Sequence, residues 1–407
     1  MFDKKITARL QELLPHMPPV ICEASLQYDI DDLVKQYAPS ACYAVVDDVN
    51  TSTALGKQVS KAISGNASCM NITLADGILA DDDAVDYIRT KTSICDVLVA
   101  VGGGTVNDLC KYAAHLDNKQ YIVFPTCASM NGYLSANASI TVKNHKTTFA
   151  AKLPEAIFCD LGIIGKAPVR LSKSGLGDSL ARPTAQADWL LSHILTGSKY
   201  DETPFSLLTD IEAELFDSAE GIAKNDPATI KLLMQLLLLS GIGMTIAGGS
   251  YPASQGEHMI AHTYGMLQKT SAHTLHGEEI GITSLYMAKR QELLLKSKPQ
   301  IGSRKFDYNY IASLFGDQMT EEFKSAFAKK IDSLNGLSDS INLEKWDEIR
   351  GKIDQIAIDT VKMENIIKKA GLLSDIKELG WDKNIYKTAC KTARFTRDRF
   401  TFLDIEN

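Results

Sequence analysis

The sequence predicts an α/β domain built on a parallel sheet, followed by a second domain that is mostly helical. In the first part of the 407-residue chain, short apolar runs typical of buried strands alternate with helical patterns. From about Leu171 onward, helical periodicity dominates and few strand-like runs occur. We therefore expect one domain over residues 1–168 and another over residues 169–407.

The expected elements of the first domain alternate regularly. Apolar runs predict strands over 41–46, 71–74, 97–101 and 121–125, and helical patterns occupy 53–64, 82–92 and 109–114. Strands that alternate with helices need crossover connections, which give a doubly wound, mostly parallel sheet. Ligands of such sheets bind beyond the carboxyl ends of the strands. In the second domain, helical periodicity covers 180–195, 204–224, 227–248, 257–268 and 277–296.

Composition and charge exclude several classes of function. Hydrophobic residues make up 45% and charged residues 23%, as in a globular protein, and the formal net charge is -7. This acidic balance gives no basic surface for nucleic acid. The eight cysteines include no Cys-x-x-Cys pair, which favours a reduced, cytoplasmic protein. We expect no membrane span and no nucleic-acid partner, and a small molecule as the ligand.

Three glycines stand between a predicted strand and a predicted helix. Gly102, Gly103 and Gly104 follow an apolar run, and Thr105 and Asp108 come next in the motif Gly-Gly-Gly-Thr-Val-Asn-Asp. Without Cβ atoms, the backbone amides at a helix N-terminus can approach a pyrophosphate closely. The motif predicts a dinucleotide site, and a tight turn that only ends the strand is the alternative.

Two further polar segments are candidate site elements. The loop over residues 125–132 follows a predicted strand and could contact nucleotide or substrate, whereas Asn131-Gly132 is also a strong turn dipeptide. Asp178 stands in a Gly-Leu-Gly-Asp motif before an apolar run. It is a candidate metal ligand, and a helix N-cap is the alternative.

The histidines are concentrated in two short segments. His258 and His262 lie one helical turn apart on one face, and His276 precedes a glycine at a predicted helix start. Of the eight histidines, five fall in or near candidate motifs: these three, His273 and His145. With Asp178, His258 and His276 supply one oxygen and two nitrogens, a ligand set typical of a catalytic divalent metal. A structural histidine is the alternative in each case, and ligand type does not distinguish zinc from iron or nickel.

In this order, the motifs resemble those of the sn-glycerol-1-phosphate dehydrogenases, within the superfamily of iron-containing alcohol dehydrogenases and dehydroquinate synthases. The resemblance covers most of the chain and implies a dehydroquinate synthase-like fold, with an N-terminal nucleotide-binding domain and a C-terminal helical metal-binding domain. It is carried by residues 102–108, 125–132, 151–157, 175–181 with Ala187-Asp188-Trp189, 249–258, 275–281 and 397–404.

The resemblance implies a role for individual residues. Asp178, His258 and His276 are implied to hold one divalent metal, which is zinc or alternatively iron or nickel. The dinucleotide, NAD or NADP, is implied to be lined by Gly102, Gly103, Gly104, Thr105, Asp108, Thr126, Ser129 and Ser135. Asp47 matches an acidic position that binds the adenosine ribose. A carboxylate there favours NAD, because the 2′-phosphate of NADP would meet like charge.

The expected catalytic residues are Asp178 and Asn131, from the resemblance, and His262, from its spacing to His258. His262 lies one turn beyond His258, from where it could shuttle a proton. Where the family usually has Asp-Gly, this chain has Asn131-Gly132, and the amide keeps one acceptor oxygen but loses the charge. Arg182 stands where many relatives carry lysine.

The implied reaction is the NAD(P)-linked, metal-dependent interconversion of dihydroxyacetone phosphate and sn-glycerol 1-phosphate. The alternatives are a glycerol or polyol dehydrogenase with an unphosphorylated substrate, a dehydroquinate synthase-like sugar-phosphate cyclase, and a relative that has lost or altered its activity. The cyclases carry Asp-Ser-Ser-Val-Gly-Gly-Lys in the second loop and a glutamate as the first metal ligand. This chain has Ser-Met-Asn-Gly over residues 129–132 and Asp178 at those positions.

The resemblance also implies a homo-oligomer of two or more subunits. A phosphorylated substrate requires cations that bind its phosphate group. The candidate cations are Lys143, His145, Lys146 and Lys152 after the second loop, and Lys387, Lys391 and Arg394 near the C-terminus. For each of them, a solvated charged surface is the alternative.

Overall fold

The computed structural model describes residues 2–142, 145–268, 274–297, 299–334, 336–338 and 341–406. These residues form two compact units, each made of two separate stretches of chain. The first unit comprises Met1–Gly175 and Ser206–Gly249, and the second comprises Leu176–Phe205 and Ser250–Asn407. Two of the predicted site residues, Lys143 and His273, lie outside the described residues, as do the side chains of His145 and Lys146.

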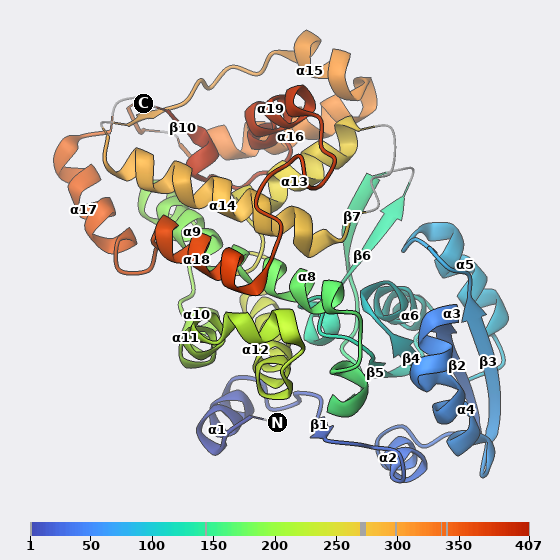
Figure 1. Cartoon of the computed structure of the whole chain (residues 1–407). Coiled ribbons are helices and arrows are strands. Elements are labelled where there is room, and N and C mark those ends of the chain that lie inside the picture. The colour runs from blue at the N-terminus through green and yellow to red at the C-terminus, as the bar shows by residue number, and fades with distance from the viewer. Residues whose placement is uncertain are drawn as a thin grey trace. The chain divides into compact units, whose positions relative to one another are not determined.

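The first unit is built on a six-stranded sheet in which every strand pair is parallel. The strand order is β1-β8-β5-β4-β2-β3 (Figure 1). The strands are β1 (Val20–Glu23), β2 (Cys42–Asp48), β3 (Ser68–Leu74), β4 (Val97–Gly102), β5 (Gln120–Pro125) and β8 (Ile157–Asp160). The predicted doubly wound parallel sheet is confirmed.

Helices cover both faces of this sheet. Because successive strand residues point to opposite faces, Val97, Val99 and Val101 of β4 pack with α2 (Ile30–Tyr37) and α4 (Lys57–Ser64). The helices α5 (Asp82–Lys91) and α6 (Gly104–Leu116) pack against one another. Every residue of β4 is buried, as expected for a strand covered on both sides.

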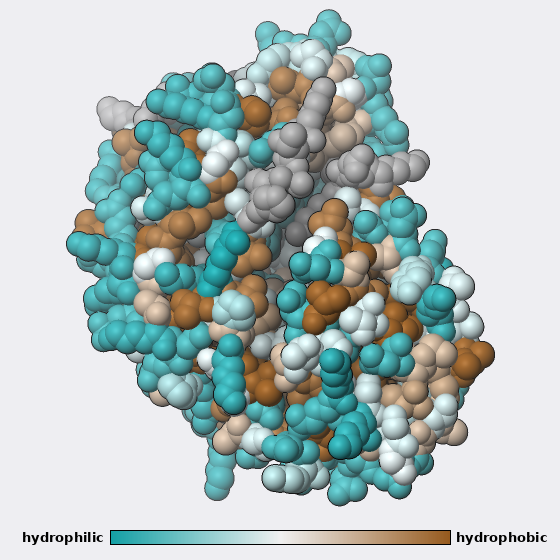
Figure 2. Space-filling model, turned by 45° about the vertical axis from the view of Figure 1, so that its right-hand side comes forward, coloured by the Kyte–Doolittle hydropathy of each residue, from teal (hydrophilic) through white to brown (hydrophobic). Residues whose placement is uncertain are grey.

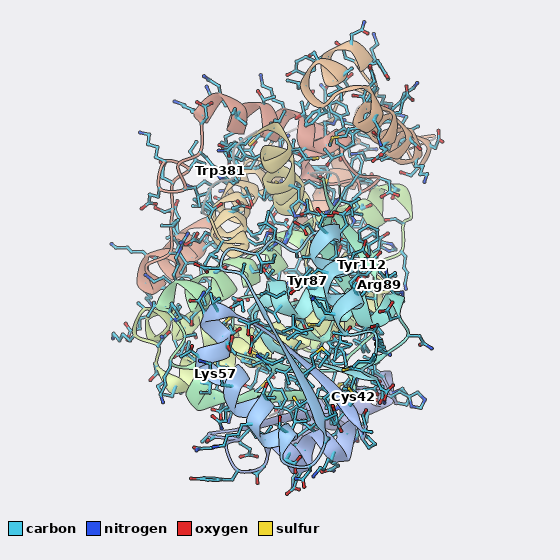
Figure 3. All side chains as sticks on the ribbon, turned by 90° about the vertical axis from the view of Figure 1, so that its right-hand side faces the viewer. Cys42, Lys57, Tyr87, Arg89, Tyr112 and Trp381 are labelled. Carbon is cyan, nitrogen blue, oxygen red and sulfur yellow. The ribbon has the colours of Figure 1, made fainter. Side chains whose placement is uncertain are left out.

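Shorter elements complete the N-terminal part of this unit. A hairpin of β6 (Asn137–Val142) and β7 (His145–Ala150), which the sequence pattern did not predict, follows the polar loop after β5. The remaining elements are α1 (Lys4–Leu13), α3 (Val49–Thr51), the π-helix η1 (Ser52–Gly56), the 3-10 helix η2 (Gly132–Leu134) and α7 (Leu161–Ile164). Lys57 at the start of α4 and Cys42 at the start of β2 are labelled in Figure 3.

The division of the chain differs from the predicted single boundary after residue 168. The stretch with α11 (Thr209–Asp217), η3 (Ala219–Lys224) and α12 (Pro227–Ala247) belongs to the first unit. It does so because α12 packs on η2 and α7. Thr245 Oγ1 also donates a hydrogen bond to the carbonyl oxygen of Leu134, at 3.2 Å. Helical periodicity identifies such a helix but not the surface that it covers.

The helix α12 bears on the expectation that the chain has no membrane span. It is 21 residues long with a mean hydropathy of 1.8 in its most apolar window, so it is long and apolar enough to cross a membrane by composition alone. In this structure 67% of that window is buried, and residues such as Leu233, Leu237 and Leu239 are completely or almost completely buried. These properties also fit a core helix of a globular unit.

The second unit is mostly helical, as predicted. After the end of α8 (Val169–Ser179), its helices are α9 (Ala181–Thr196), α10 (Thr203–Ser206), α13 (Gly256–Leu267), α14 (His276–Leu295), α15 (Tyr308–Phe315), α16 (Asp317–Asp332), α17 (Leu343–Ile353), α18 (Thr360–Ala370), α19 (Lys383–Thr392), η4 (Ala393–Phe395) and η5 (Phe402–Asp404). The short strands β9 (Gln300–Ile301) and β10 (Ile405–Glu406) pair antiparallel. Trp381, labelled in Figure 3, stacks on Tyr264 with ring centroids 3.9 Å apart.

Polar and apolar side chains are intermixed on the face of the molecule in Figure 2. Large exposed hydrophobic side chains such as Tyr28, Leu79 and Ile94 are spread along the chain. Isolated apolar side chains of this kind are common on globular proteins and do not by themselves indicate an interface.

A buried ion cluster attaches the C-terminal residues to the second unit. Asp404 accepts hydrogen bonds from Lys330 Nζ at 3.0 Å and from Arg394 Nε at 3.1 Å. The side chains of Lys330, Arg394 and Asp404 are 1%, 8% and 2% exposed. One buried carboxylate is therefore shared by two cations that have little access to water, and the exposed Glu406 lies 3.7 Å from Arg394 Nη1.

Removal of that carboxylate is expected to destabilise the second unit strongly. Asp404→Ala leaves the buried Lys330 without a carboxylate and Arg394 with only the exposed Glu406, and we expect a loss of about 3–5 kcal/mol in the free energy of unfolding. All three tryptophans (Trp189, Trp346 and Trp381) lie in this unit, so urea unfolding followed by tryptophan fluorescence reports on it.

The matched control is Glu348→Ala, which removes an exposed carboxylate from its pairs with Lys345 and Lys352. It should change the stability by less than about 1 kcal/mol. An Asp404→Ala protein that unfolds at the same urea concentration as the unmodified chain would show that the cluster does not stabilise the unit.

Candidate functional site

The glycine-rich turn of the first unit joins β4 to α6. Gly103 is the N-cap of α6, and no side chain caps the helix there. A Cβ atom on Gly102 would lie 2.7 Å from Val106 Cβ, and one on Gly104 would lie 2.9 Å from Met130 Sδ. Gly102 is therefore required by packing against Val106, whereas a Cβ atom on Gly104 would displace the flexible side chain of Met130, and no side chain caps the amides of the first helical turn. Such a turn can hold a phosphate group.

Lys111 connects this turn to the polar loop after β5. Its side chain is completely buried, and Nζ donates to the carbonyl oxygens of Gly132, Ser135 and Asn137. Asp108 accepts a hydrogen bond from the backbone of Ser139 at 3.1 Å. The sequence analysis did not identify Lys111, because its acceptors are carbonyl groups that lie 21 to 26 residues away.

The predicted nucleotide-binding residues of this unit differ in exposure. Thr126 and Ser135 are buried, whereas Gly103, Thr105, Ser129 and Asn131 are partly exposed. Ser135 Oγ donates to the carbonyl oxygen of Gly132 at 3.1 Å, so it also holds the loop together.

Asp47, predicted to bind ribose, is completely buried at the end of β2. It lies beneath Gly56, where a Cβ atom would come within 2.0 Å of its Oδ2, and burial raises the pKa of its carboxyl group. The adjacent Asp48 is partly exposed and caps α3 by accepting from the amides of Asn50 and Thr51. Asp48 is thus the carboxylate with access to solvent at this strand end, since side chains alternate along a strand.

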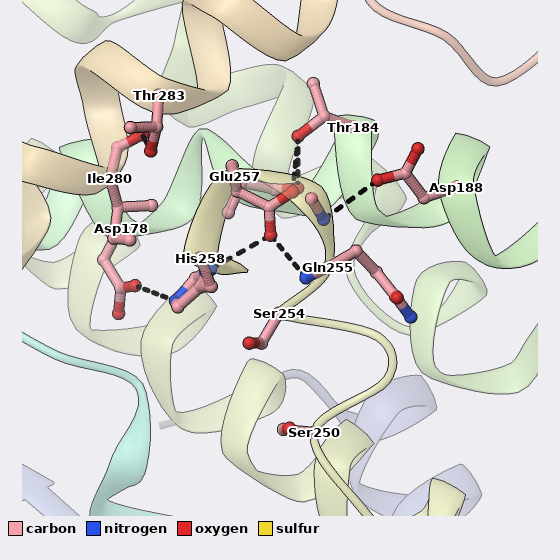
Figure 4. Close-up of polar contacts among 12 residues, drawn as sticks. Asp178, Thr184, Asp188, Ser250, Ser254, Gln255, Glu257, His258, Ile280 and Thr283 are labelled. Atoms are coloured by element: carbon pink, nitrogen blue, oxygen red, sulfur yellow. Dashed lines mark hydrogen bonds and ion pairs between the residues drawn. The ribbon is translucent and has the colours of Figure 1, made fainter. Parts of the chain in front are cut away.

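In the second unit, Asp178, His258 and His276 come together from three helices. Asp178 Oδ1 lies 3.7 Å from His258 Nε2 and 4.0 Å from His276 Nε2. One potential ligand atom from each residue lies within 4.8 Å of the other two. Figure 4 shows Asp178 and His258 directed toward one another.

A close approach of two glycines positions two of these residues. A Cβ atom on Gly177 would lie 2.1 Å from the carbonyl oxygen of Gly277, so only glycine allows α8 to approach the start of α14 so closely. Asp178 and His276 are the adjacent residues. Asp178 lies inside α8 and not at a helix start, which excludes the alternative that it is an N-cap.

The donor atoms fit a divalent cation. Asp178 is 3% exposed, and its Oδ1 is buried without a hydrogen-bond partner among the described residues. A carboxylate oxygen in this position is costly unless a cation binds it. One carboxylate oxygen and two imidazole nitrogens match the ligand set of a catalytic divalent metal with an open position.

Glu257 orients one of the histidines and was not identified from the sequence. Its buried Oε1 accepts from His258 Nδ1 at 2.9 Å and from the amide of Gln255 at 2.7 Å (Figure 4). This contact places the hydrogen of the neutral ring on Nδ1 and leaves the lone pair of Nε2 for a metal. Burial alone would lower the pKa of His258, but the carboxylates Asp178 and Glu257 raise it overall. The signal in the sequence was the acidic residue directly before the histidine.

Asp188 holds the start of α13 in place. It accepts from the amides of Gly256 and Phe402, each at 3.0 Å, and from Gln291 Nε2 at 3.2 Å. Burial, followed by the charge of Glu257, raises its pKa to about 8. The motif Ala-Asp-Trp, which contributed to the family resemblance, therefore holds the start of α13, the helix that carries His258.

His262 lies beside the triad, as the helical spacing predicts. Its ring centroid is 5.9 Å from that of His258 and 5.8 Å from that of His276. Arg397 Nη2 lies 3.1 Å from His262 Nδ1. Because a guanidinium can only donate, Nδ1 accepts and the hydrogen of the ring is on Nε2.

Four of the cationic residues predicted to bind phosphate have described side chains, and their contacts can be stated. Lys152 donates to the carbonyl oxygen of Lys119, and Arg394 is paired with Asp404. Lys387 and Lys391 are exposed on α19.

Comparisons with known proteins show which family the chain is similar to. A family model for iron-containing alcohol dehydrogenases matches residues 23–168. A glycerol-1-phosphate dehydrogenase [NAD(P)+] of Bacillus licheniformis is 28% identical over 392 residues, which covers 93% of this chain and 87% of that protein. The enzyme of the same name from Pyrococcus horikoshii is 34% identical over 270 residues, 66% of this chain and 77% of that protein.

Solved structures show the same fold at lower identity. A probable glycerol dehydrogenase from Sinorhizobium meliloti has 16% sequence identity and a TM-score of 0.61, and the match covers 95% of this chain and 92% of that one. The chain belongs to the glycerol-1-phosphate dehydrogenases of the iron-containing alcohol dehydrogenase family.

Proposed function

We propose that the protein reduces dihydroxyacetone phosphate to sn-glycerol 1-phosphate with NAD(P)H, and catalyses the reverse oxidation, with a divalent metal at Asp178, His258 and His276. The observation that carries this proposal is the buried, hydrogen-bond-free Oδ1 of Asp178 facing two histidine nitrogens. The names of the related enzymes support the substrate and the cofactor. The protein is proposed to be a cytoplasmic enzyme.

The metal, when bound, would polarise the substrate oxygen and stabilise negative charge on it as hydride is transferred. The protein's own residues prepare this chemistry. Glu257 keeps Nε2 of His258 available by accepting the hydrogen bond from Nδ1. His262 carries its hydrogen on Nε2, from where it can donate to an alcohol or carbonyl oxygen and pass on a proton.

The cofactor site is assigned to the first unit. Backbone amides at the start of α6 would bind the pyrophosphate, helped by Gly102, Gly103, Gly104 and Thr105. Asp108, Thr126, Ser129 and Ser135 would line the dinucleotide directly or through the loop that they hold. We assign the ribose contact to Asp48 in place of the buried Asp47, and its charge favours NAD over NADP.

Three further properties of the enzyme are proposed. The metal is zinc, or alternatively iron or nickel, because the donor set suits all three. The active protein is a homo-oligomer of at least two subunits. Asn131 occupies the position of the family's aspartate, and this observation favours a polyol dehydrogenase acting on an unphosphorylated substrate as the second candidate function.

Metal binding is tested by removing a ligand. His258→Ala and His276→Ala should each lose the bound metal, measured by elemental analysis, together with turnover, because two ligands cannot replace three. Chelation of the unmodified enzyme should have the same effect on turnover. The control is His193→Ala, an exposed histidine of α9, which should keep both metal and activity. Full activity in a metal-free preparation would contradict the mechanism.

The role of Glu257 is tested by Glu257→Gln. The amide is nearly isosteric but uncharged, so it orients His258 less strongly, and we expect a loss of about 10–100-fold in metal affinity. Competition with a chromogenic chelator measures this affinity independently of activity. An unchanged affinity would show that the hydrogen bond to His258 does not support metal binding.

His262 is tested separately from the ligands. His262→Ala should lower kcat by at least about 100-fold, since general acid–base catalysis by a side chain typically contributes that much. Its metal content should stay at the level of the unmodified enzyme. A variant that keeps kcat and its pH dependence would exclude a role in proton transfer.

A further inference from the structure

Two arginines lie beside the histidine cluster without an acidic partner. Arg397 Nη1 donates to Ser254 Oγ at 3.1 Å, and its Nη2 donates to His262 Nδ1 at 3.1 Å. Arg399 donates to the carbonyl oxygen of Ser254 and, at 3.0 Å, to Ser250 Oγ. All of these acceptors are neutral, so the two positive charges are not compensated by their hydrogen-bond partners.

No carboxylate among the described residues forms an ion pair with either guanidinium. The nearest acidic groups are Glu257 and Asp398, which act on Arg397 only at longer range. Glu257 already accepts from His258 and Gln255, and Asp398 is exposed to water. Burial, with the neighbouring charge of Arg399, lowers the pKa of Arg397 to about 9. Two such cations are costly to bury in the absence of an anion.

Arg394, three residues earlier, differs from this pair because it has a buried carboxylate partner. Its Nε donates to the buried carboxylate of Asp404 at 3.1 Å, and its Nη2 donates to the carbonyl oxygen of Ser303. This arginine therefore has a carboxylate partner, whereas Arg290 of α14 donates to two backbone carbonyl oxygens. Arg397 and Arg399 have only a hydroxyl group, a ring nitrogen or a carbonyl oxygen, and both side chains are partly exposed.

The two guanidinium groups are also held rigidly. Arg399 lies over the ring of Tyr251, 4.2 Å from its centroid, and Tyr251 in turn stacks on Trp189. Arg397 is fixed between Ser254 and His262, so neither group needs to become ordered when a ligand binds. Planar donors held in this way suit an oxyanion such as a phosphate, which can accept several hydrogen bonds at once.

Arg397 and Arg399 lie close to Asp178, His258 and His276, the three proposed metal ligands. Arg397 contacts His262, and the ring of His262 is a direct neighbour of the rings of His258 and His276. One imidazole therefore separates the guanidinium from the ligand atoms. This arrangement fits a small molecule that has its reacting oxygen at one end and an anionic group at the other.

We propose that Arg397 and Arg399 bind the phosphate group of the substrate and give the enzyme its preference for a phosphorylated ketone. This inference rests on the proposed function, because it assigns the part of the same site that recognises the phosphate. It replaces Lys152, Lys387, Lys391 and Arg394 as the source of the cations. The sequence offered a signal in the motif Arg-Asp-Arg-Phe near the C-terminus, but not its partner groups.

The test compares a phosphorylated and an unphosphorylated substrate in matched variants. Arg397→Gln, Arg399→Gln and the control Lys387→Gln, an exposed lysine of α19, are each assayed with dihydroxyacetone phosphate and with dihydroxyacetone. We expect both arginine variants to lose at least tenfold in kcat/KM for the phosphate ester relative to dihydroxyacetone. Lys387→Gln should keep the ratio of the unmodified enzyme.

A second measurement does not depend on turnover. Inorganic phosphate should raise the unfolding temperature of the unmodified protein, followed by tryptophan fluorescence, and this shift should disappear in Arg397→Gln and Arg399→Gln. Elemental analysis of the same preparations shows whether the metal is still bound. Arg397→Lys separates charge from geometry, since an ammonium group cannot contact Ser254, His262 and a phosphate in the same plane.

The outcomes distinguish this inference from the proposed function. If the unmodified enzyme prefers dihydroxyacetone phosphate and the arginine variants keep that preference and the phosphate-induced shift, the assignment of the arginines is wrong while the function stands. If the unmodified enzyme reduces both ketones equally well and phosphate does not stabilise it, the phosphate site is excluded and the substrate is an unphosphorylated polyol. If it reduces neither ketone, the proposed function itself fails, and the phosphate-induced shift alone then decides whether the arginines bind an anion.

Discussion

The contact between Gly177 and Gly277 is the constraint on which the second unit's site depends. With the carbonyl oxygen of Gly277 only 2.1 Å from the place of a Cβ on Gly177, any larger residue would separate α8 from α14. The ligand candidates are the residues next to these glycines, Asp178 and His276. Any increase in the distance between the helices would move a carboxylate oxygen and an imidazole nitrogen apart. The close packing of α8 against α14 therefore decides whether Asp178 and His276 can bind the same metal ion.

The second unit contains two kinds of buried charge, those that are paired with an opposite charge and those that are not. At the C-terminal end, buried charges of opposite sign pair with one another, as Lys330 and Arg394 do with Asp404. Around the histidine cluster they do not. Asp178 has a free oxygen, and Arg397 and Arg399 have neutral partners. Uncompensated groups of opposite sign in one region are what a site for a cation and an anionic substrate requires, since the ligands supply the missing charges.

In the first unit, packing and ligand binding share the same glycines. Gly102 is required because Val106 occupies the space of a Cβ atom there, and Met130 fills the corresponding space at Gly104. The result is a turn in which backbone amides are not covered by side chains. Lys111 then holds the following loop through three carbonyl groups, so the loop shape depends on one buried cation. The glycine motif alone would also fit a plain turn, and its order with the other motifs favours a nucleotide site.

The sequence by itself determined the parallel sheet, the mainly helical second part and the candidate ligands Asp178, His258 and His276, because these follow from local periodicity and from short motifs in a fixed order. Tertiary structure decided what those patterns cannot report. It assigned residues 206–249 to the first unit, buried Asp47 while leaving Asp48 accessible, and gave His258 its partner Glu257. It also left Arg397 and Arg399 without a carboxylate while Arg394 acquired Asp404. The physical reason is that a side chain's partners and its access to water are set by segments far away in the chain, whereas periodicity reports only which face of a helix or strand is buried.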